Sequence, residues 1–142
     1  MYSVMLTGGR SAQDLYGSRI FLDQIVGLCS KSRFFLTDER MVFPEHEYSN
    51  YGMILRVLFQ NMPSGFFDFP PMFKASVNTN DNSSSYSELL PEVIDVLLLS
   101  MGEDGHIASL FPGSPALSET ERKVLPVIGP KVPFQRLTIT HI

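Results

Sequence analysis

The sequence feature that most constrains the fold is an apolar run of six residues, 94–99, that leads directly into a cluster of glycines and ionisable side chains. The run reads IDVLLL, and Asp95 is its only polar residue. Strands buried on both faces of a parallel sheet are near-continuous apolar runs, whereas half-exposed strands alternate apolar and polar residues. The run therefore predicts a central strand of a parallel sheet, covered on both faces.

The cluster after this strand contains Asp104 and His106, bracketed by Gly102 and Gly105, which allow a sharp turn. Ligands of open α/β sheets bind at the carboxyl ends of strands. A histidine near a carboxylate that orients its ring has the composition of a general base. The alternative is a surface turn in which Asp104 caps a short helix over 107–111 and His106 only packs. The spacing alone leaves both interpretations open.

The composition fits one globular domain without a nucleic-acid or membrane role. The 142 residues are 44% hydrophobic, which is enough for a single core. The net charge of -4 offers no basic face for nucleic acid, and no apolar run approaches the roughly 20 residues of a membrane span. Cys29 is the only cysteine, so we expect a packed thiol and no disulfide. We expect a cytoplasmic protein.

The N-terminal segment has the layout of an anion-binding loop. A short strand is predicted at Ser3–Leu6 and a helix from Ser11 to about Ser30, with Ser11 as its N-cap. Gly8, Gly9 and Arg10 lie between them. Exposed amides at a helix start bind phosphate. A glycine pair after a strand is weak evidence by itself, so a plain strand-to-helix turn stays the favoured alternative at this point.

A second charged cluster follows the predicted strand Arg33–Thr37. Asp38, Glu39 and Arg40 come directly after it, and three charges at such a place are hard to explain as core. They form either a solvated turn or part of a crevice. Because Asp38 and Arg40 are two residues apart, both would face the mouth of the same crevice.

The middle of the chain is expected to be mostly irregular. In order, the sequence predicts a helix from about Ser49 or Asn50, a strand-like segment at Met72–Val77, a mobile polar loop or linker at Asn78–Ser85, and one or two helical turns at Tyr86–Glu92. The loop is expected because its polar residues have no apolar period with which to bury surface.

Two strands are predicted in the C-terminal part, at Lys123–Ile128 and Arg136–Ile142. Pro126 lacks the N–H of a sheet ladder, so the first is expected to be an edge strand or broken. Lys131 and Arg136 lie in the proline-stiffened segment between them. On local pattern alone, Arg136 is favoured as a solvated residue at the start of a strand.

Four segments of the chain resemble motifs of one enzyme family, the 6-phosphogluconolactonases, within the superfamily of glucosamine-6-phosphate isomerases and deaminases. In the central segment, SMGEDGHIASLFPGSPAL is similar to the family's GMGxDGHTASLFPGxxAL. In the family's order, LTGGRSAQDLY resembles SGGSTPxxLY, FLTDERMVFPEHEYSNYGM resembles WGDERxVPPDHxxSNYGM, and GPKVPFQRLTIT resembles SPKPPxxRITLT. Together the four segments cover most of the chain.

The resemblance implies a Rossmann-like α/β fold with a mostly parallel sheet and flanking helices. It also implies hydrolysis of 6-phosphogluconolactone to 6-phosphogluconate, a step of the pentose phosphate pathway, without metal or cofactor. His106 would activate water, Asp104 would orient His106, and Arg40 and Asp38 would line the catalytic pocket. The implied residues for binding the sugar phosphate are Gly8, Gly9, Arg10, Ser11, Lys131 and Arg136.

The chain departs from the family pattern in sequence and in length. Arg10 and Ser11 replace a serine and a threonine, Ser100 replaces a glycine, and Ile107 replaces a threonine. Family members also have elements before the glycine loop and after position 142, including a lysine of the phosphate site. We therefore expect one domain over residues 1–142 that is incomplete relative to the family, with exposed strand edges that favour self-association.

Two other functions stay open beside the lactonase. A sugar-phosphate isomerase or deaminase is disfavoured, because that branch has DEY where this chain has Asp38, Glu39 and Arg40. It also has Asn-Glu-Pro where this chain has Leu110–Pro112. The third candidate is a non-catalytic protein that binds sugar phosphate, which the shorter length would allow.

Overall fold

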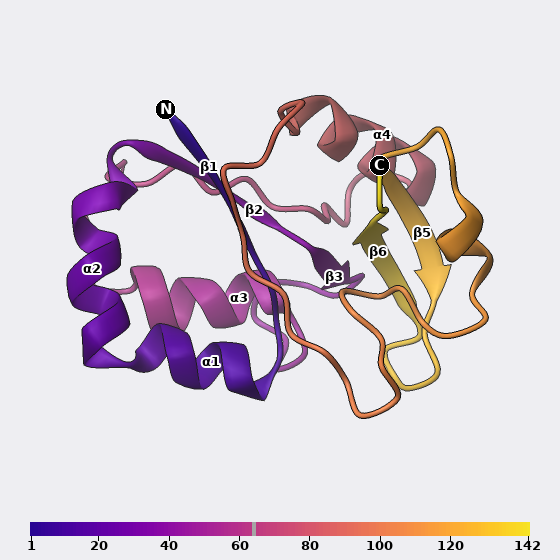
Figure 1. Cartoon of the computed structure of the whole chain (residues 1–142), viewed down its shortest axis with the longest axis horizontal. Coiled ribbons are helices and arrows are strands. Elements are labelled where there is room, and N and C mark those ends of the chain that lie inside the picture. Colours follow the sequence, from indigo (N-terminus) through magenta and orange to yellow (C-terminus); the bar gives the residue numbers. More distant parts are fainter. Residues whose placement is uncertain (64) are drawn as a thin grey trace.

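The computed structural model describes residues 1–63 and 65–142 and contains two three-stranded sheets (Figure 1). The strands are β1 (Tyr2–Leu6), β2 (Ser32–Leu36), β3 (Asp38–Arg40), β4 (Val96–Leu97), β5 (Val124–Ile128) and β6 (Gln135–Ile139). One sheet is parallel, in the order β2-β1-β4, and the other is antiparallel, in the order β3-β6-β5. The α/β class is confirmed, but the C-terminal strands form a sheet of their own instead of extending the parallel one.

Helices pack beside both sheets. They are α1 (Arg10–Gly17), α2 (Arg19–Cys29), α3 (Asn50–Ile54) with its π-helical continuation (Leu55–Phe59), α4 (Thr79–Leu89), and a 3-10 turn (Pro115–Ser118). In Figure 1, α1, α2 and α3 lie together beside the parallel sheet, whereas α4 lies next to β5. Within the described ranges, no helix combines the length and the hydropathy that crossing a membrane requires.

The two sheets meet at Thr37, the single residue between β2 and β3. Its N–H donates to the carbonyl of Leu6 at 2.9 Å, and its carbonyl accepts from the N–H of Ile139 at 2.8 Å. One continuous segment therefore passes from the parallel sheet into the antiparallel sheet (Figure 1). We call this junction the sheet seam. It brings the carboxyl ends of β1 and β2 next to β3 and β6.

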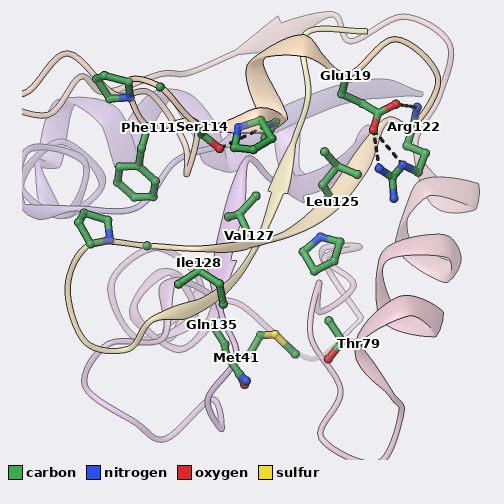
Figure 2. Close-up of a pocket in the computed structure, with 17 residues that line it drawn as sticks. Met41, Thr79, Phe111, Ser114, Glu119, Arg122, Leu125, Val127, Ile128 and Gln135 are labelled. Carbon is green, nitrogen blue, oxygen red and sulfur yellow. Dashed lines mark hydrogen bonds and ion pairs between the residues drawn. The ribbon is translucent and has the colours of Figure 1, made fainter.

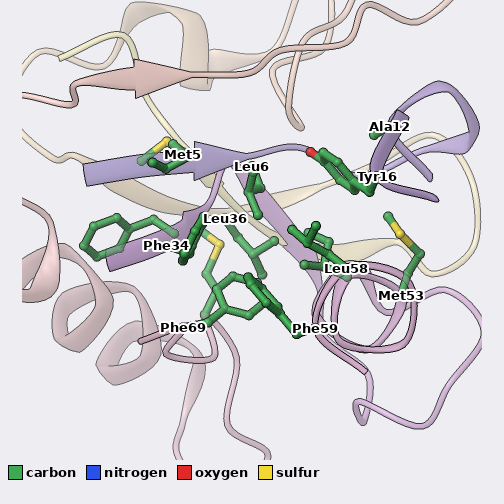
Figure 3. Close-up of a cluster of buried hydrophobic side chains, with 14 of the residues drawn as sticks. Met5, Leu6, Ala12, Tyr16, Phe34, Leu36, Met53, Leu58, Phe59 and Phe69 are labelled. Atoms are coloured by element: carbon green, nitrogen blue, oxygen red, sulfur yellow. The ribbon is translucent and has the colours of Figure 1, made fainter. Parts of the chain in front are cut away.

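The hydrophobic core lies between the parallel sheet and its helices (Figure 3). Its largest fully buried side chains include two tyrosines whose hydroxyls form hydrogen bonds with backbone groups at the ends of strands. The Tyr16 hydroxyl donates to the Thr7 carbonyl at 2.9 Å and accepts from the Thr7 N–H at 3.0 Å, and the Tyr86 hydroxyl accepts from the N–H of Leu36 at 2.6 Å. Because a buried backbone group without a partner is costly, both tyrosines stabilise the strand ends that lead to the seam.

The helix predicted from Ser11 to about Ser30 is two helices, because the chain turns at Ser18. This residue has an extended backbone (φ −72°, ψ 136°), and its Oγ accepts from the N–H of Phe21 at 3.3 Å, which starts α2. The prediction of Ser11 as N-cap is wrong. The residue before α1 is Gly9, whose φ of 97° favours glycine, and no side chain caps this helix.

Two predictions for the middle of the chain are wrong. The segment Met72–Val77 is not a strand. The tract Asn78–Ser85 is no mobile loop, because it belongs to α4: the Asn78 side chain accepts from the N–H of Asp81 at 2.9 Å and caps the helix. The buried side-chain amide of Asn82 also bonds to the backbone of Lys74 and Val77, and so attaches the helix to the preceding segment. The predicted helical turns at Tyr86–Glu92 are present only as far as Leu89.

The central apolar run also differs from its prediction. Only Val96–Leu97 forms a strand, and β4 lies at the edge of its sheet, so no described strand pairs with its outer side. Val96 and Leu97 are each 46% exposed, against the expectation of a strand covered on both faces. The predicted helix over 107–111 is instead a turn in which Ala108 has a φ of 50° and Ile107 bridges to Leu110.

The remaining strand predictions are confirmed in outline. β1 and β2 lie at the expected positions, and the helix α3 begins after Ser49, whose Oγ accepts from the N–H of Gly52 at 2.9 Å. β5 is an edge strand, as Pro126 predicted. β6 ends at Ile139 and is the central strand of its sheet. Cys29 is buried.

Candidate active site

A polar pocket of about 210 Å³ lies at the sheet seam. It collects side chains and glycines from the carboxyl ends of β1 and β4 and from both β3 and β6. Most of the predicted site residues line it: Gly8, Gly9, Arg10, Ser11, Asp38, Arg40, His106 and Arg136. Residues that the prediction did not name complete the lining: Thr7, Asn50, Ser100, Met101, Gly102 and Ala108.

His106 and Asp104 form a close pair at one wall of the pocket. The ring Nδ1 lies 2.5 Å from Oδ1 of Asp104, and the His106 N–H donates to the same oxygen at 3.3 Å. The bond from His106 holds the pKa of Asp104 below its usual value. With the Nδ1 proton directed at Asp104, Nε2 is the nitrogen left to accept a proton. Asp104 does not line the pocket, so it acts on the site through His106.

The turn that carries this pair depends on Gly102. Its N–H donates to the carbonyl of His106 at 2.8 Å, and the N–H of Gly105 donates to the carbonyl of Gly102 at 3.0 Å. A Cβ at position 102 would lie inside van der Waals contact with the His106 ring. The imidazole therefore occupies the space that any larger residue would need.

Arg136 is a buried cation that also lines the pocket. It lies in β6 and is only 6% exposed. Its Nε donates to the carbonyl of Pro133 at 3.2 Å, its Nη2 donates to the carbonyl of Lys131 at 3.3 Å, and its guanidinium lies over the Phe111 ring at 5.4 Å. Burial, and next the charge of Arg40, lowers the pKa of Arg136, while Asp38 acts in the opposite direction.

Lys131 is not brought into the pocket. Its side chain is exposed on the loop before β6, and only its carbonyl takes part, as an acceptor for Arg136. The alternative of a solvated Arg136 is wrong, because the loop encloses its guanidinium. The Arg136 side chain occupies the space that a Cβ at Gly129 would need.

β3 presents its charges to two sides. Asp38 and Arg40 face the pocket, as their spacing predicted, and Nη1 of Arg40 donates to the carbonyl of Tyr48 at 2.8 Å. Glu39, between them, is 2% exposed and belongs to the interior. Its carboxylate accepts from the N–H groups of Arg40 (2.7 Å), Asn50 (2.8 Å) and Tyr51 (2.7 Å), and from the Ser49 hydroxyl (3.1 Å).

Glu39 therefore holds the start of α3 against β3, which sequence reasoning did not foresee. Burial raises the pKa of Glu39 to about 7, although its four hydrogen bonds act to lower it. A buried carboxylate is retained only where donors surround it, and here they come from the backbone of the following helix. Glu39, one of three charges that are hard to explain as core from the sequence, is among the most buried residues.

The glycine loop forms the third wall. The N–H of Gln13 donates to the carbonyl of Gly9 at 2.9 Å and is the first hydrogen bond of the helix. The N–H groups before it, at the start of α1, have no acceptor within the helix. A Cβ at Gly8 would collide with the amide of Asn50. The Ser100 hydroxyl donates to the Gly8 carbonyl at 3.3 Å and joins the loop to the segment after β4. Helix-start amides beside Arg136 favour an anion.

A larger cavity, of about 760 Å³, lies beside β5 and the 3-10 turn (Figure 2). Apolar side chains such as Leu125, Val127 and Phe111 line it. Its charged residues, Glu119 and Arg122, are paired with each other, with Nη2 of Arg122 at 2.7 Å from Oε2 of Glu119. Because it contains neither a histidine nor an unpaired charge among its lining residues, the smaller polar pocket is the candidate active site.

Comparisons with known proteins agree on one family. The sequence model of the family described as glucosamine-6-phosphate isomerases/6-phosphogluconolactonase matches residues 1–142. The chain is 35% identical to a 6-phosphogluconolactonase of Pseudomonas putida. The aligned region covers 97% of this chain and 58% of that protein. It is 31% identical to 6-phosphogluconolactonase 3 of Saccharomyces cerevisiae, and this alignment covers 98% of the chain and 61% of that protein.

Solved structures give the same result. The crystal structure of 6-phosphogluconolactonase from Thermotoga maritima superposes with a TM-score of 0.80 at 28% identity, over 98% of this chain and 63% of that chain. The 6-phosphogluconolactonase from Trypanosoma brucei superposes with a TM-score of 0.76 at 31% identity, over 98% and 64%. The chain thus spans about 60% of the length of these relatives.

Proposed function

We propose that this chain, which belongs to the glucosamine-6-phosphate isomerase/6-phosphogluconolactonase family, carries the active site for hydrolysis of 6-phosphogluconolactone to 6-phosphogluconate. The observation that supports this most is the His106–Asp104 pair at the wall of a pocket that also holds Arg136 and Arg40. The reaction is a step of the pentose phosphate pathway. A cytoplasmic location stays a prediction from composition.

In the proposed mechanism, Nε2 of His106 takes a proton from water as the water oxygen attacks the lactone carbonyl. Asp104 stabilises the resulting imidazolium and keeps the ring in one orientation. The tetrahedral oxyanion then collapses, the ring C–O bond breaks, and the leaving oxygen receives the proton from His106. Water is consumed, and the open chain carries a hydroxyl and a carboxylic acid, which releases its proton to solvent and becomes a carboxylate.

Positive charge in the pocket serves two purposes in this proposal. Arg40, with Asp38 beside it, faces the reacting end and stabilises the oxyanion. Arg136 and the amides of the loop Gly8–Ser11 bind the phosphate, whose several oxygens suit a forked cation. Arg10 adds a second guanidinium on that side. Lys131 contributes through its carbonyl, which orients Arg136.

The test of the catalytic assignment is the rate of lactone decay above the spontaneous background. His106→Ala should lower the enzymatic rate on the order of 100-fold or more, as for loss of a general base. His46→Ala is a matched control, because His46 is exposed on the loop before α3. An alanine variant at 106 that kept the parent's rate enhancement would refute the role of His106.

The phosphate site is tested by titration with 6-phosphogluconate and with unphosphorylated gluconate. The parent should prefer the phosphorylated ligand, and Arg136→Ala should lose most of that preference. Arg19→Ala serves as control, since Arg19 is almost fully exposed on α2. Equal affinity of the parent for both ligands would contradict the phosphate site. Selective binding without hydrolysis would instead favour the non-catalytic alternative.

A further inference from the structure

The carboxylate of Asp38 is held by uncharged donors. It is only 5% exposed, and within the described residues no cation lies within salt-bridge distance of it. Oδ1 accepts from the Thr37 hydroxyl and from Nδ2 of Asn50, each at 3.3 Å. Oδ2 accepts from the Ser109 hydroxyl at 2.6 Å. The Ser109 bond is by far the shortest, as expected for an O–H bound to a charged acceptor.

Ser109 belongs to the same turn as His106. It follows Ala108, whose positive φ of 50° reverses the chain, and it is completely buried. Its N–H donates to Oγ1 of Thr138 in β6 at 3.1 Å. Through this one residue the turn is attached to β3 by its side chain and to β6 by its backbone.

We propose that Ser109 is a positioning residue that sets the placement of the His106 turn relative to Asp38. The inference rests on the proposed function. The pocket has the base on the turn after β4, and the charges Asp38, Arg40 and Arg136 on β3 and β6. The Ser109 hydroxyl joins these two parts directly, through its hydrogen bond to Asp38, which lies 71 residues away in sequence.

The hydroxyl is therefore expected to matter more for turnover than for substrate binding. Among the described residues, Ser109 makes its side-chain-mediated hydrogen bonds to Thr138 and Asp38, and none to Gly8–Ser11 or Arg136, the phosphate-binding side of the pocket. A displaced His106 turn changes the geometry between the water, the base and the carbonyl, and misplacement of reacting groups by a small distance lowers the rate strongly. A substitution that only reduced the amount of folded protein would also lower the apparent kcat at unchanged KM, so kcat is expressed per folded molecule and the His106 ring signal described below serves as the independent readout.

The experiment compares Ser109→Ala with Ser109→Thr, which restores the hydroxyl, and with Ser83→Ala as matched control. Ser83 is 7% exposed, and its hydroxyl donates to the Asn80 carbonyl at 2.8 Å, remote from the pocket. Ser109→Ala should lower kcat about 10-fold with KM within about 2-fold of the parent. Ser109→Thr should recover most of kcat, and Ser83→Ala should leave kcat unchanged.

If Ser109→Ala does not fold, Ser109→Cys takes its place, because a thiol has a similar volume and is a weak donor. Parent-like kcat in Ser109→Ala, or in folded Ser109→Cys, would overturn the proposal. So would a folded Ser109→Thr as slow as the alanine variant.

A second readout separates this inference from the proposed function. The ring Cε1–Hε1 NMR signal of His106 should move or broaden in Ser109→Ala and stay in place in Ser83→Ala. If the parent hydrolyses no lactone, the function fails, but this signal still tests the positioning. An unchanged His106 signal in Ser109→Ala would refute the link whatever the activity.

Discussion

At the scale of single residues, the site is shaped as much by missing side chains as by present ones. Three glycines each border a functional side chain that fills the space of a Cβ: Gly8 borders Asn50, Gly102 borders His106 and Gly129 borders Arg136. The proposed chemistry therefore depends also on three residues that have no side chain. The family motifs quoted above have glycines at the positions of Gly8 and Gly102 and a serine at that of Gly129, and only the structure shows which side chain each glycine of this chain accommodates.

The first prediction concerns Gly102→Ala. The new methyl would push the His106 ring off its position against Asp104, so we expect lactone hydrolysis to fall by on the order of 10- to 100-fold, much of the contribution of a general base. Gly27→Ala is the control, because a Cβ there meets nothing within 4 Å. That variant should keep full activity and be slightly more stable, by about 0.5 to 1 kcal/mol. Equal activity of both variants would contradict the crowding argument.

The second prediction uses the buried carboxylate of Glu39. Burial raises its pKa from 4.5 to about 7, so the folded chain retains a proton that the unfolded chain has lost. This contribution to stability is present below about pH 4.5 and is lost as the pH rises to about 7. The loss is on the order of 3 kcal/mol. Glu39→Gln cannot ionise, so its unfolding free energy relative to the parent should rise between about pH 5 and about pH 8.

Urea unfolding at the two pH values measures this difference. Glu39→Gln should be less stable than the parent at the lower pH, because its amide N–H groups face backbone donors, so only the change with pH is diagnostic. Glu88→Gln, on the exposed face of α4, is the control. A stability difference that is the same at both pH values would show that Glu39 is already ionised throughout.

At the scale of elements, α4 shows how a polar tract becomes ordered. The side chain of Asn82 is 3% exposed and makes four hydrogen bonds. Its Oδ1 accepts from the N–H of Lys74 at 2.8 Å, and its Nδ2 donates to the carbonyls of Lys74 (3.0 Å), Val77 (2.8 Å) and Asn78 (3.1 Å). One amide thus fixes the preceding loop on the helix.

The third prediction is that Asn82→Ala lowers the free energy of unfolding by about 1 to 3 kcal/mol, because it leaves buried backbone groups without partners. Asn80→Ala, on the exposed side of the same helix, should change it by less than about 0.5 kcal/mol. Denaturant unfolding measures both. Equal effects would mean that helix propensity, not the buried amide, determines the loss.

Local pattern predicted β1, β2 and β5, because their apolar and β-branched residues lie in short runs bounded by turns. It also singled out charges and glycines that directly follow strands, but only the resemblance to the family assigned them to a site, because local pattern left a surface turn open at His106 and favoured a solvated Arg136. It could not predict α4, whose order comes from Asn82, or the exposure of β4, because a run of apolar residues does not show what covers it. Ser109 and Asn50 gave no local signal, since their partners lie far away in sequence.

At the scale of the whole molecule, an apolar groove of about 520 Å³ runs along β4 and the end of β6. Leu97 and Leu99 line it and are 46% and 45% exposed. An edge strand with free backbone groups beside such a surface is prone to pair with another chain. Self-association through this edge was expected from the sequence and stays a prediction.

The fourth prediction is that the 142-residue chain associates with rising concentration and that Leu97→Lys reduces this association, because a charge on an edge strand opposes pairing. Leu117→Lys is the control, since Leu117 is 47% exposed but lies in the 3-10 turn. Sedimentation velocity over a concentration series distinguishes them. A parent chain that sediments as a monomer at every concentration would contradict self-association through the β4 edge.

The sheet seam has a consequence for how the pocket selects its ligand. The loop at Gly8 follows one sheet, Arg136 belongs to the other, and Thr37 joins the two with one hydrogen bond to each. The width of the pocket therefore depends on the angle between the sheets, and Asn50 spans both sides, because its amide lies against Gly8 and donates to Asp38 of β3. Under the proposed function a sugar phosphate would contact both sides at once, so any change of this angle that binding required would lower its affinity. Discrimination between ligands of different length would then depend on the sheet seam as well as on the groups that contact the ligand.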